Sequence, residues 1–150
     1  MALSDKINQD LKDAMKSGDK LRLQTIRSIR ASILEFEKSG AGKEMSAEEE
    51  IKLLTTAAKK RKESIELFNK GGREELAKAE EAELQIIMSY LPEQLSAEDI
   101  EKEVIIIAGK IGANSKADFG KLMGAAIKEL KGKADGREIK NLVEKVLGEN

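Results

Sequence analysis

The chain has 150 residues, of which 37% are charged and only 3% aromatic, and its formal net charge is −1. It contains neither cysteine nor histidine, which excludes disulfides, thiolate nucleophiles, the usual zinc sites and the commonest general base. A core with so few aromatic residues must be built from Leu, Ile, Ala, Met and Val, which suits packed helices. The near-zero net charge argues against a protein that coats nucleic acid over its whole surface.

No apolar stretch reaches the roughly 18 residues that a membrane-spanning helix needs. The first residues also lack the apolar core of a secretory signal. We therefore expect a cytoplasmic protein that does not associate with membranes.

Hydrophobic periodicity and glycine punctuation predict seven helices and an all-α fold. Helix-start patterns support four of these helices, because Ser46, Ser96, Ser115 and Asp135 each stand three positions before an acidic residue. A strand is conceivable only at residues 104–107, but the sequence offers it no partner strand, so a helix is preferred there. The predicted helices span residues 3–17, 19–38, 47–70, 73–90, 97–111, 116–131 and 136–147.

Pro92 ends the fourth predicted helix, since proline has no amide hydrogen and pushes the preceding residue out of the helical region. We place a linker at residues 92–95. Residues 1–91 are then expected to form an elongated antiparallel helical part, and residues 96–150 a compact three-helix domain.

The third and fourth predicted helices form a hairpin whose apolar seams each contain one charged position. Pairing antiparallel neighbours around the turn sets Arg61 opposite Glu80 or Glu81. We expect an ion pair there that fixes the register of the hairpin at some cost in stability. The alternative, in which Arg61 reaches into a ligand site, stays open.

The helix predicted over residues 116–131 carries two contrasting faces. The apolar face, expected to be buried, consists of Phe119, Leu122, Met123, Ala126, Ile127 and Leu130. The opposite side carries a stripe of small residues, Ala117, Gly120 and Gly124, flanked by Lys121, Lys128 and Lys131. A glycine inside a helix costs about 1 kcal/mol relative to alanine, so two on one face predict close approach by another backbone. A neighbouring helix of the same chain would explain the glycines, whereas the lysines favour a phosphate backbone.

The sequence "KGKADG" follows this helix, and local structure explains most of it. Gly132 suits a helix end and Asp135 suits the start of the next helix. Lys131 and Lys133 remain without a structural role, and Arg137 lies in the first turn of the last helix. Together with the exposed amides of that turn, they form a candidate phosphate site.

Two stretches, "KKRKESIELFNKGGREELAKAEEAELQIIMSYLPEQLSAEDI" at 59–100 and "DFGKLMGAAIKELKGKADGREIKNLV" at 118–143, resemble the GatB/YqeY family of small bacterial proteins. The resemblance covers essentially the whole chain. The same domain forms the C-terminal tail of the GatB component of the aspartyl/glutamyl-tRNA amidotransferase, where it contacts the tRNA and does not perform the chemistry. The resemblance implies an all-helical fold and matches Gly120, Met123, Gly124 and residues 131–134 to the glycine-rich helix of that tail. Residues 135–136 are Asp-Gly where the tail usually has Asn-Pro, so identical RNA contacts are not implied.

The family is associated with glutamine-dependent amidotransferase, a carbon–nitrogen ligase whose reaction needs a metal–nucleotide cradle and an amidase nucleophile. In this sequence no glycine-rich phosphate loop opens a helix, and no serine has a basic partner arranged for it. We therefore expect a non-catalytic helical domain that contacts tRNA or another RNA and needs no cofactor or metal. The candidate RNA-binding residues are Gly120, Lys121, Gly124, Lys128, Lys131, Lys133 and Arg137. The alternatives are a protein-interaction adaptor without RNA contact and an accessory that binds amidotransferase subunits.

Overall fold

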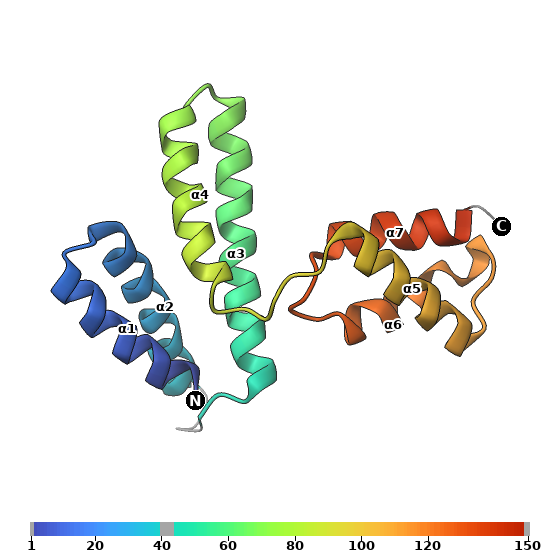
Figure 1. Ribbon diagram of the computed structural model, residues 1–150, viewed down its shortest axis with the longest axis horizontal. Coiled ribbons are helices and arrows are strands. Elements are labelled where there is room, and N and C mark those ends of the chain that lie inside the picture. The colour runs from blue at the N-terminus through green and yellow to red at the C-terminus, as the bar shows by residue number, and fades with distance from the viewer. Residues whose placement is uncertain (1, 40–43, 149–150) are drawn as a thin grey trace. The chain divides into compact units, whose positions relative to one another are not determined.

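The computed structural model describes residues 2–39 and 44–148, and the described part of the chain consists of helices joined by turns and short irregular segments, with no strand. The expectation of an all-α fold with seven helices is confirmed (Figure 1). The helices are α1 (Leu3–Ser17), α2 (Lys20–Ser39), α3 (Ala47–Lys70), α4 (Glu74–Met88), α5 (Ala97–Ile111), α6 (Phe119–Glu129) and α7 (Gly136–Gly148), with a 3-10 turn over Lys116–Asp118.

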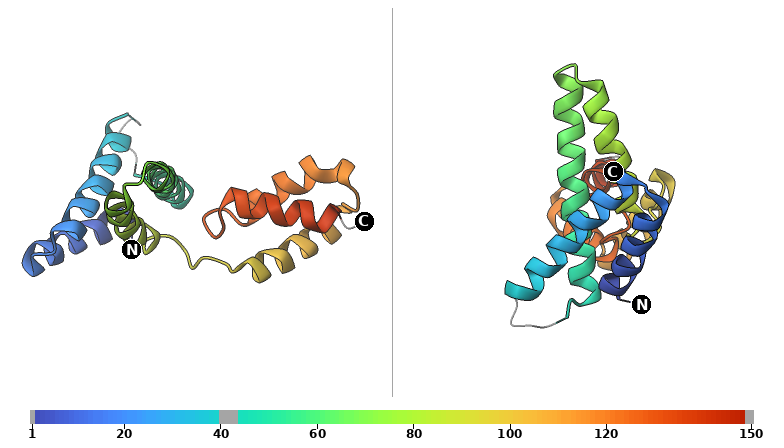
Figure 2. Two further views of the ribbon diagram at one scale, coloured as in Figure 1. Left: turned by 90° about the horizontal axis from the view of Figure 1, so that it is seen from above. Right: turned by 90° about the vertical axis from the view of Figure 1, so that its left-hand side faces the viewer.

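The chain divides into two compact units, residues 1–91 and residues 92–150. The N-terminal unit contains two helical hairpins, α1 with α2 and α3 with α4 (Figure 1). Figure 2 shows α3 and α4 side by side over the length of α4. The core of this unit is aliphatic, as the composition requires, and is formed by Leu3, Ile7, Ala14, Ile26, Ile29, Ile33, Leu54, Ala58 and Ile87.

The end of the N-terminal unit is tied back to α1 by its single tyrosine. The hydroxyl of Tyr90 donates a hydrogen bond to the carboxylate of Asp10 at 2.6 Å. The ammonium nitrogen of Lys6 lies 5.2 Å from the centre of the Tyr90 ring, a cation–π distance. Burial of the Tyr90 hydroxyl and its bond to Asp10 raise the pKa of the phenol, which keeps this donor protonated.

An ion pair crosses the α3–α4 hairpin at Arg61. The Nε atom of Arg61 lies 3.4 Å from a carboxylate oxygen of Glu80 and 2.9 Å from one of Glu83. Glu81, the other partner considered, is exposed. The seam pattern did not single out Glu83, which lies one turn along α4 and reaches back to the same guanidinium. One cation therefore serves two half-buried carboxylates.

The C-terminal unit is a three-helix bundle in which α5, α6 and α7 pack against one another. Its buried residues are Ile100, Val104, Ile107, Ala108, Leu122, Ala126, Leu130, Ile139, Val143 and Leu147. Residues 104–107, where a strand was conceivable, lie inside α5. The hydroxyl of Ser96 accepts a hydrogen bond from the amide of Asp99 and so caps the start of this helix.

Helix α6 is shorter than the sequence predicts, and hydrogen bonds at both ends explain the difference. The carboxylate of Asp118 accepts bonds from the amides of Asn114 and Ser115, which hold a 3-10 turn ahead of the helix. At the other end, the Lys133 amide donates to the carbonyl of Leu130, and Gly132 adopts a left-handed φ of 80°. A residue with a side chain is strained in that conformation, so Gly132 ends the helix and begins the turn.

The shared guanidinium at Arg61 predicts a pH effect on stability. Burial raises the pKa of Glu80 above its ordinary value of 4.5, and the charge of Glu83 raises it further, while Arg61 opposes both. A carboxyl whose pKa is higher in the folded than in the unfolded chain binds a proton more tightly when folded. Its contribution to stability therefore grows as the pH falls from neutral through the folded pKa, and levels off below the unfolded value. In Glu80→Gln this pH-dependent gain should disappear, while stability at neutral pH stays within about 1 kcal/mol of wild type because Arg61 keeps Glu83.

The measurement is urea unfolding at a series of pH values from 7 down to about 4, compared between variants. Glu81→Gln is the matched control, because it removes the same charge from an exposed neighbouring position and should keep the wild-type profile. If the free energy of unfolding of Glu80→Gln and of wild type changed with pH in parallel, Glu80 would not be the source of the pH effect.

Candidate nucleic-acid interface

The packing of α6 decides which of its residues face solvent. Leu122 and Ala126 have no exposed surface, and Phe119 and Met123 pack against the core of the C-terminal unit from the same side. The opposite side of the helix carries Gly120 and Gly124, both exposed.

Ile127 is the exception to the predicted apolar face. It was expected to be buried, but its relative exposure is 44%. The bundle buries a narrower stripe of α6 than a broad helical-wheel face implies, because α5 and α7 are the helices that cover it in the described part of the C-terminal unit. Ile127 therefore lies on the same side as Gly120 and Gly124, at the edge of the small residues.

The glycines of α6 leave open space on the surface of the C-terminal unit. Among the described residues, a Cβ atom built on Gly120 or Gly124 would meet no atom within 4 Å beyond the adjoining backbone of α6 itself. No described helix of the same unit comes within that distance, so packing within the bundle does not account for the two glycines. We call Gly120, Gly124 and their exposed neighbour Ile127 the glycine face.

Lys121 has a structural role that the helical wheel did not reveal. Its ammonium group donates a hydrogen bond to the carbonyl of Ile111 at 3.1 Å and so satisfies the C-terminal end of α5. Asp118 lies close by, and hydrogen bonding, first from the backbone of Asn114, lowers the pKa of its carboxyl, with a smaller contribution from the charge of Lys121. Of the predicted lysines, Lys121 is thus engaged within the fold.

The remaining candidate cations surround the end of α6. Lys128, Lys131 and Lys133 are exposed. Within residues 2–39 and 44–148, no ion pair or hydrogen bond engages their ammonium groups. We call residues 131–133 the basic turn, because two exposed lysines flank the buried Gly132 there.

The start of α7 is organised by Asp135. Its carboxylate accepts a hydrogen bond from the backbone amide of Arg137 at 2.8 Å, as a helix-capping residue does. Arg137 itself is exposed in the first turn of α7. Because Asp135 already occupies one amide at this helix start, the lysines of the basic turn are the stronger candidates for an anion.

One residue beside the basic turn was missed by the sequence patterns. The side-chain amide of Gln94 donates a hydrogen bond to the carbonyl of Gly132 at 2.7 Å. Gln94 has no periodic or motif signal, since it lies in an irregular segment and its partner is 38 residues away.

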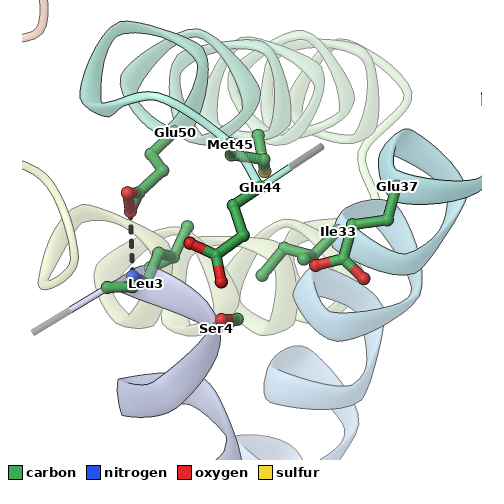
Figure 3. Close-up of a pocket in the computed structure, with 8 residues that line it drawn as sticks. Leu3, Ser4, Ile33, Glu37, Glu44, Met45 and Glu50 are labelled. Atoms are coloured by element: carbon green, nitrogen blue, oxygen red, sulfur yellow. Dashed lines mark hydrogen bonds between the residues drawn. The ribbon is translucent and has the colours of Figure 1, made fainter. Parts of the chain in front are cut away.

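The N-terminal unit contains a small hollow beside the start of α1 (Figure 3). It has a volume of about 60 Å³ and is bordered by the carboxylates of Glu37, Glu44 and Glu50. Glu50 accepts a hydrogen bond from the amide of Leu3 at 2.9 Å and so caps the start of α1. Among the described residues, no group of acidic side chains is arranged to hold a metal ion. Capping of α1 therefore accounts for the position of the Glu50 carboxylate at this hollow.

The described helices include none that is long and apolar enough to cross a membrane.

Comparisons with known proteins identify relatives over most of the chain. The protein named "Altered inheritance of mitochondria protein 41, mitochondrial" from Pyrenophora tritici-repentis is 29% identical over 146 residues, which cover 95% of this chain and 80% of the relative. The protein of the same name from Lachancea thermotolerans is 36% identical over 95 residues, 63% of this chain and 51% of the relative. A third, from Eremothecium gossypii, is 34% identical over 85 residues and is matched over 46% of its length. The chain thus spans about half the length of the latter two relatives.

These relatives contradict the expectation of a cytoplasmic protein, because their names describe them as mitochondrial. The expectation was based on the missing apolar signal core, and that observation bears only on secretion. Mitochondrial targeting segments are amphipathic and basic, so a test for apolar segments does not address them.

The family model described as "Yqey-like protein" matches residues 4–147, nearly the whole chain, in agreement with the resemblance drawn from the sequence. The chain is therefore a member of the Yqey-like protein family.

Proposed function

We propose that this protein contacts the phosphate backbone of an RNA, with tRNA as the first candidate, through the glycine face and the basic turn, and that it does so without catalysing a reaction. The observation that carries the proposal is the open space over Gly120 and Gly124 beside exposed lysines. Glycine at these positions lets another backbone approach closely. The ammonium groups beside them attract negative charge, which favours the phosphate backbone of a nucleic acid.

Composition narrows the type of RNA contact. The chain has one tyrosine, three phenylalanines and no tryptophan, and Tyr90 is engaged with Asp10. Stacking of bases on aromatic side chains is therefore a minor contribution, and recognition by shape and phosphate is expected. The mild excess of cations supports this, since residues 115–150 hold eight Lys or Arg against six Asp or Glu.

The family resemblance supports tRNA as the first RNA to test, because the related tail of the amidotransferase contacts tRNA. The names of the fungal relatives refer to inheritance of mitochondria and mention neither RNA nor amide transfer. The proposal accordingly depends on the surface of α6 and the basic turn.

A second candidate function is a protein adaptor, and Ile127 is the observation that favours it. An isoleucine exposed at 44% beside two glycines is a surface on which a partner helix packs well. An accessory of an amidotransferase complex is one form of this adaptor.

Replacing the exposed lysines tests the phosphate contacts. Combined Lys128→Gln, Lys131→Gln and Lys133→Gln substitutions should weaken tRNA binding and lower the slope of log affinity against log salt by about 2 to 3, because about 0.7 to 0.9 counterions are released per phosphate contact. Lys59→Gln with Lys60→Gln, two exposed lysines of α3, is the control that should change neither quantity. An unchanged slope in the triple variant would contradict the site.

Filling the glycine face tests the close approach. Gly124→Leu places bulk where the structure has open space, so the fold should tolerate it, and the helix should gain about 0.5–1 kcal/mol in propensity. We expect tRNA affinity to fall by at least about tenfold while the melting temperature is kept or raised. Gly109→Leu is the matched control, because Gly109 is also exposed and open, on α5. Equal affinities of the two variants would mean that nothing approaches the glycine face.

Ile127→Lys tests whether the ligand that approaches the glycine face is a polyanion. An added cation beside the glycine face should leave tRNA affinity unchanged or increase it if the ligand is a polyanion. A partner helix packed on Ile127 would instead be lost, since a charge would be buried in the contact. The measurement is tRNA binding by fluorescence anisotropy, and a clear loss of affinity would contradict the phosphate contact.

A further inference from the structure

The segment that leads into α5 is hydrogen-bonded to the basic turn. The side-chain nitrogen of Gln94 donates to the carbonyl of Pro92 at 2.8 Å and to the carbonyl of Gly132 at 2.7 Å. The backbone amide of Leu95 donates to the carbonyl of Lys133 at 2.9 Å. We call these three hydrogen bonds the Gln94 clamp; all of them lie within the C-terminal unit.

The clamp uses the full donor capacity of the glutamine side chain. A side-chain amide has two N–H groups, and here each finds a backbone carbonyl at a short distance. One of these carbonyls belongs to Pro92 in the connecting segment and the other to the turn between α6 and α7. Gln94 thus joins two backbone segments that are distant in the sequence, since its partner Gly132 is 38 residues away.

The basic turn consequently has an inner and an outer side. On the inner side, Gly132 is buried and its carbonyl is held by Gln94, while Leu95 packs against the core. On the outer side, Lys131 and Lys133 are exposed. Because Gly132 has a left-handed φ, no other residue type takes this path without strain, and the backbone between the two lysines is restricted.

We propose that Gln94 is a positioning residue for the phosphate site, holding the backbone of the basic turn so that Lys131 and Lys133 are presented together. The proposal rests on the RNA contact proposed above. If the backbone of the turn is already fixed before binding, less conformational entropy is lost when the complex forms, and the affinity is higher. The coupling between the clamp and the phosphate site is reciprocal, so a phosphate backbone bound by these lysines also stabilises the hydrogen bonds of the clamp.

The first test compares Gln94→Met with wild type in binding to bulk tRNA over a salt series. Methionine has nearly the same shape but no N–H, so it removes the two side-chain bonds without leaving a hole. We expect the affinity for tRNA to fall by about 3- to 10-fold, because the basic turn would then have to be ordered when tRNA binds. The slope against salt should stay unchanged, because the same lysines contact the same phosphates. Gln85→Met, an exposed glutamine of α4, is the control and should bind as wild type does.

The second test needs no variant. Amide hydrogen exchange of Leu95, which is bonded to the carbonyl of Lys133, should slow when tRNA is added to the wild-type protein. Two results together would overturn the positioning role and leave the RNA contact standing. Gln94→Met would bind tRNA as tightly as Gln85→Met, and the amide exchange of Leu95 in the wild-type protein would not change when tRNA is added. Failure of the wild-type protein to bind tRNA would overturn the RNA contact and the positioning role together.

Discussion

Burial of Leu122 and Ala126 in the core of the C-terminal unit fixes the direction in which α6 faces. Both side chains are inaccessible to solvent, and burying such groups stabilises a small bundle by several kcal/mol at about 25 cal/mol per Å². The rotation of the helix about its own axis is therefore set by packing. The exposure of Gly120 and Gly124 on the opposite side follows from that rotation.

A second constraint organises the end of α6. The left-handed conformation of Gly132 reverses the chain within a few residues, so that the exposed Lys131 and Lys133 flank a buried backbone. The cations near the glycine face therefore come from a helix, at Lys128, and from a turn in which the carbonyls of Gly132 and Lys133 already accept hydrogen bonds. A surface built in this way has positive charge and little side-chain bulk, which suits a ligand recognised by its backbone.

Local signals in the sequence were sufficient to predict most helices to within one or two residues. Ser46 and Ser96 bond to the amides three positions on, as their spacing predicts, and the ends of α3 and α5 agree with the predicted ends. Errors arose where tertiary structure decides. Ile127 is exposed because the bundle covers only a narrow stripe of α6. Lys121 is hydrogen-bonded because the end of α5 lies beside it, and a helical wheel carries no information on neighbouring helices. Glu83 and Gln94 were missed because their partners depend on side-chain reach across elements.

Binding of a phosphate backbone by the glycine face and the basic turn is the central proposal, and tRNA binding by the unmodified protein tests it most directly. Bulk tRNA and duplex DNA of similar length would be compared over a salt series. We predict micromolar or tighter tRNA binding that is preferred over DNA and weakens linearly in log affinity against log salt. Absence of tRNA binding at low salt would contradict the proposal and make the glycine face a surface for a protein partner.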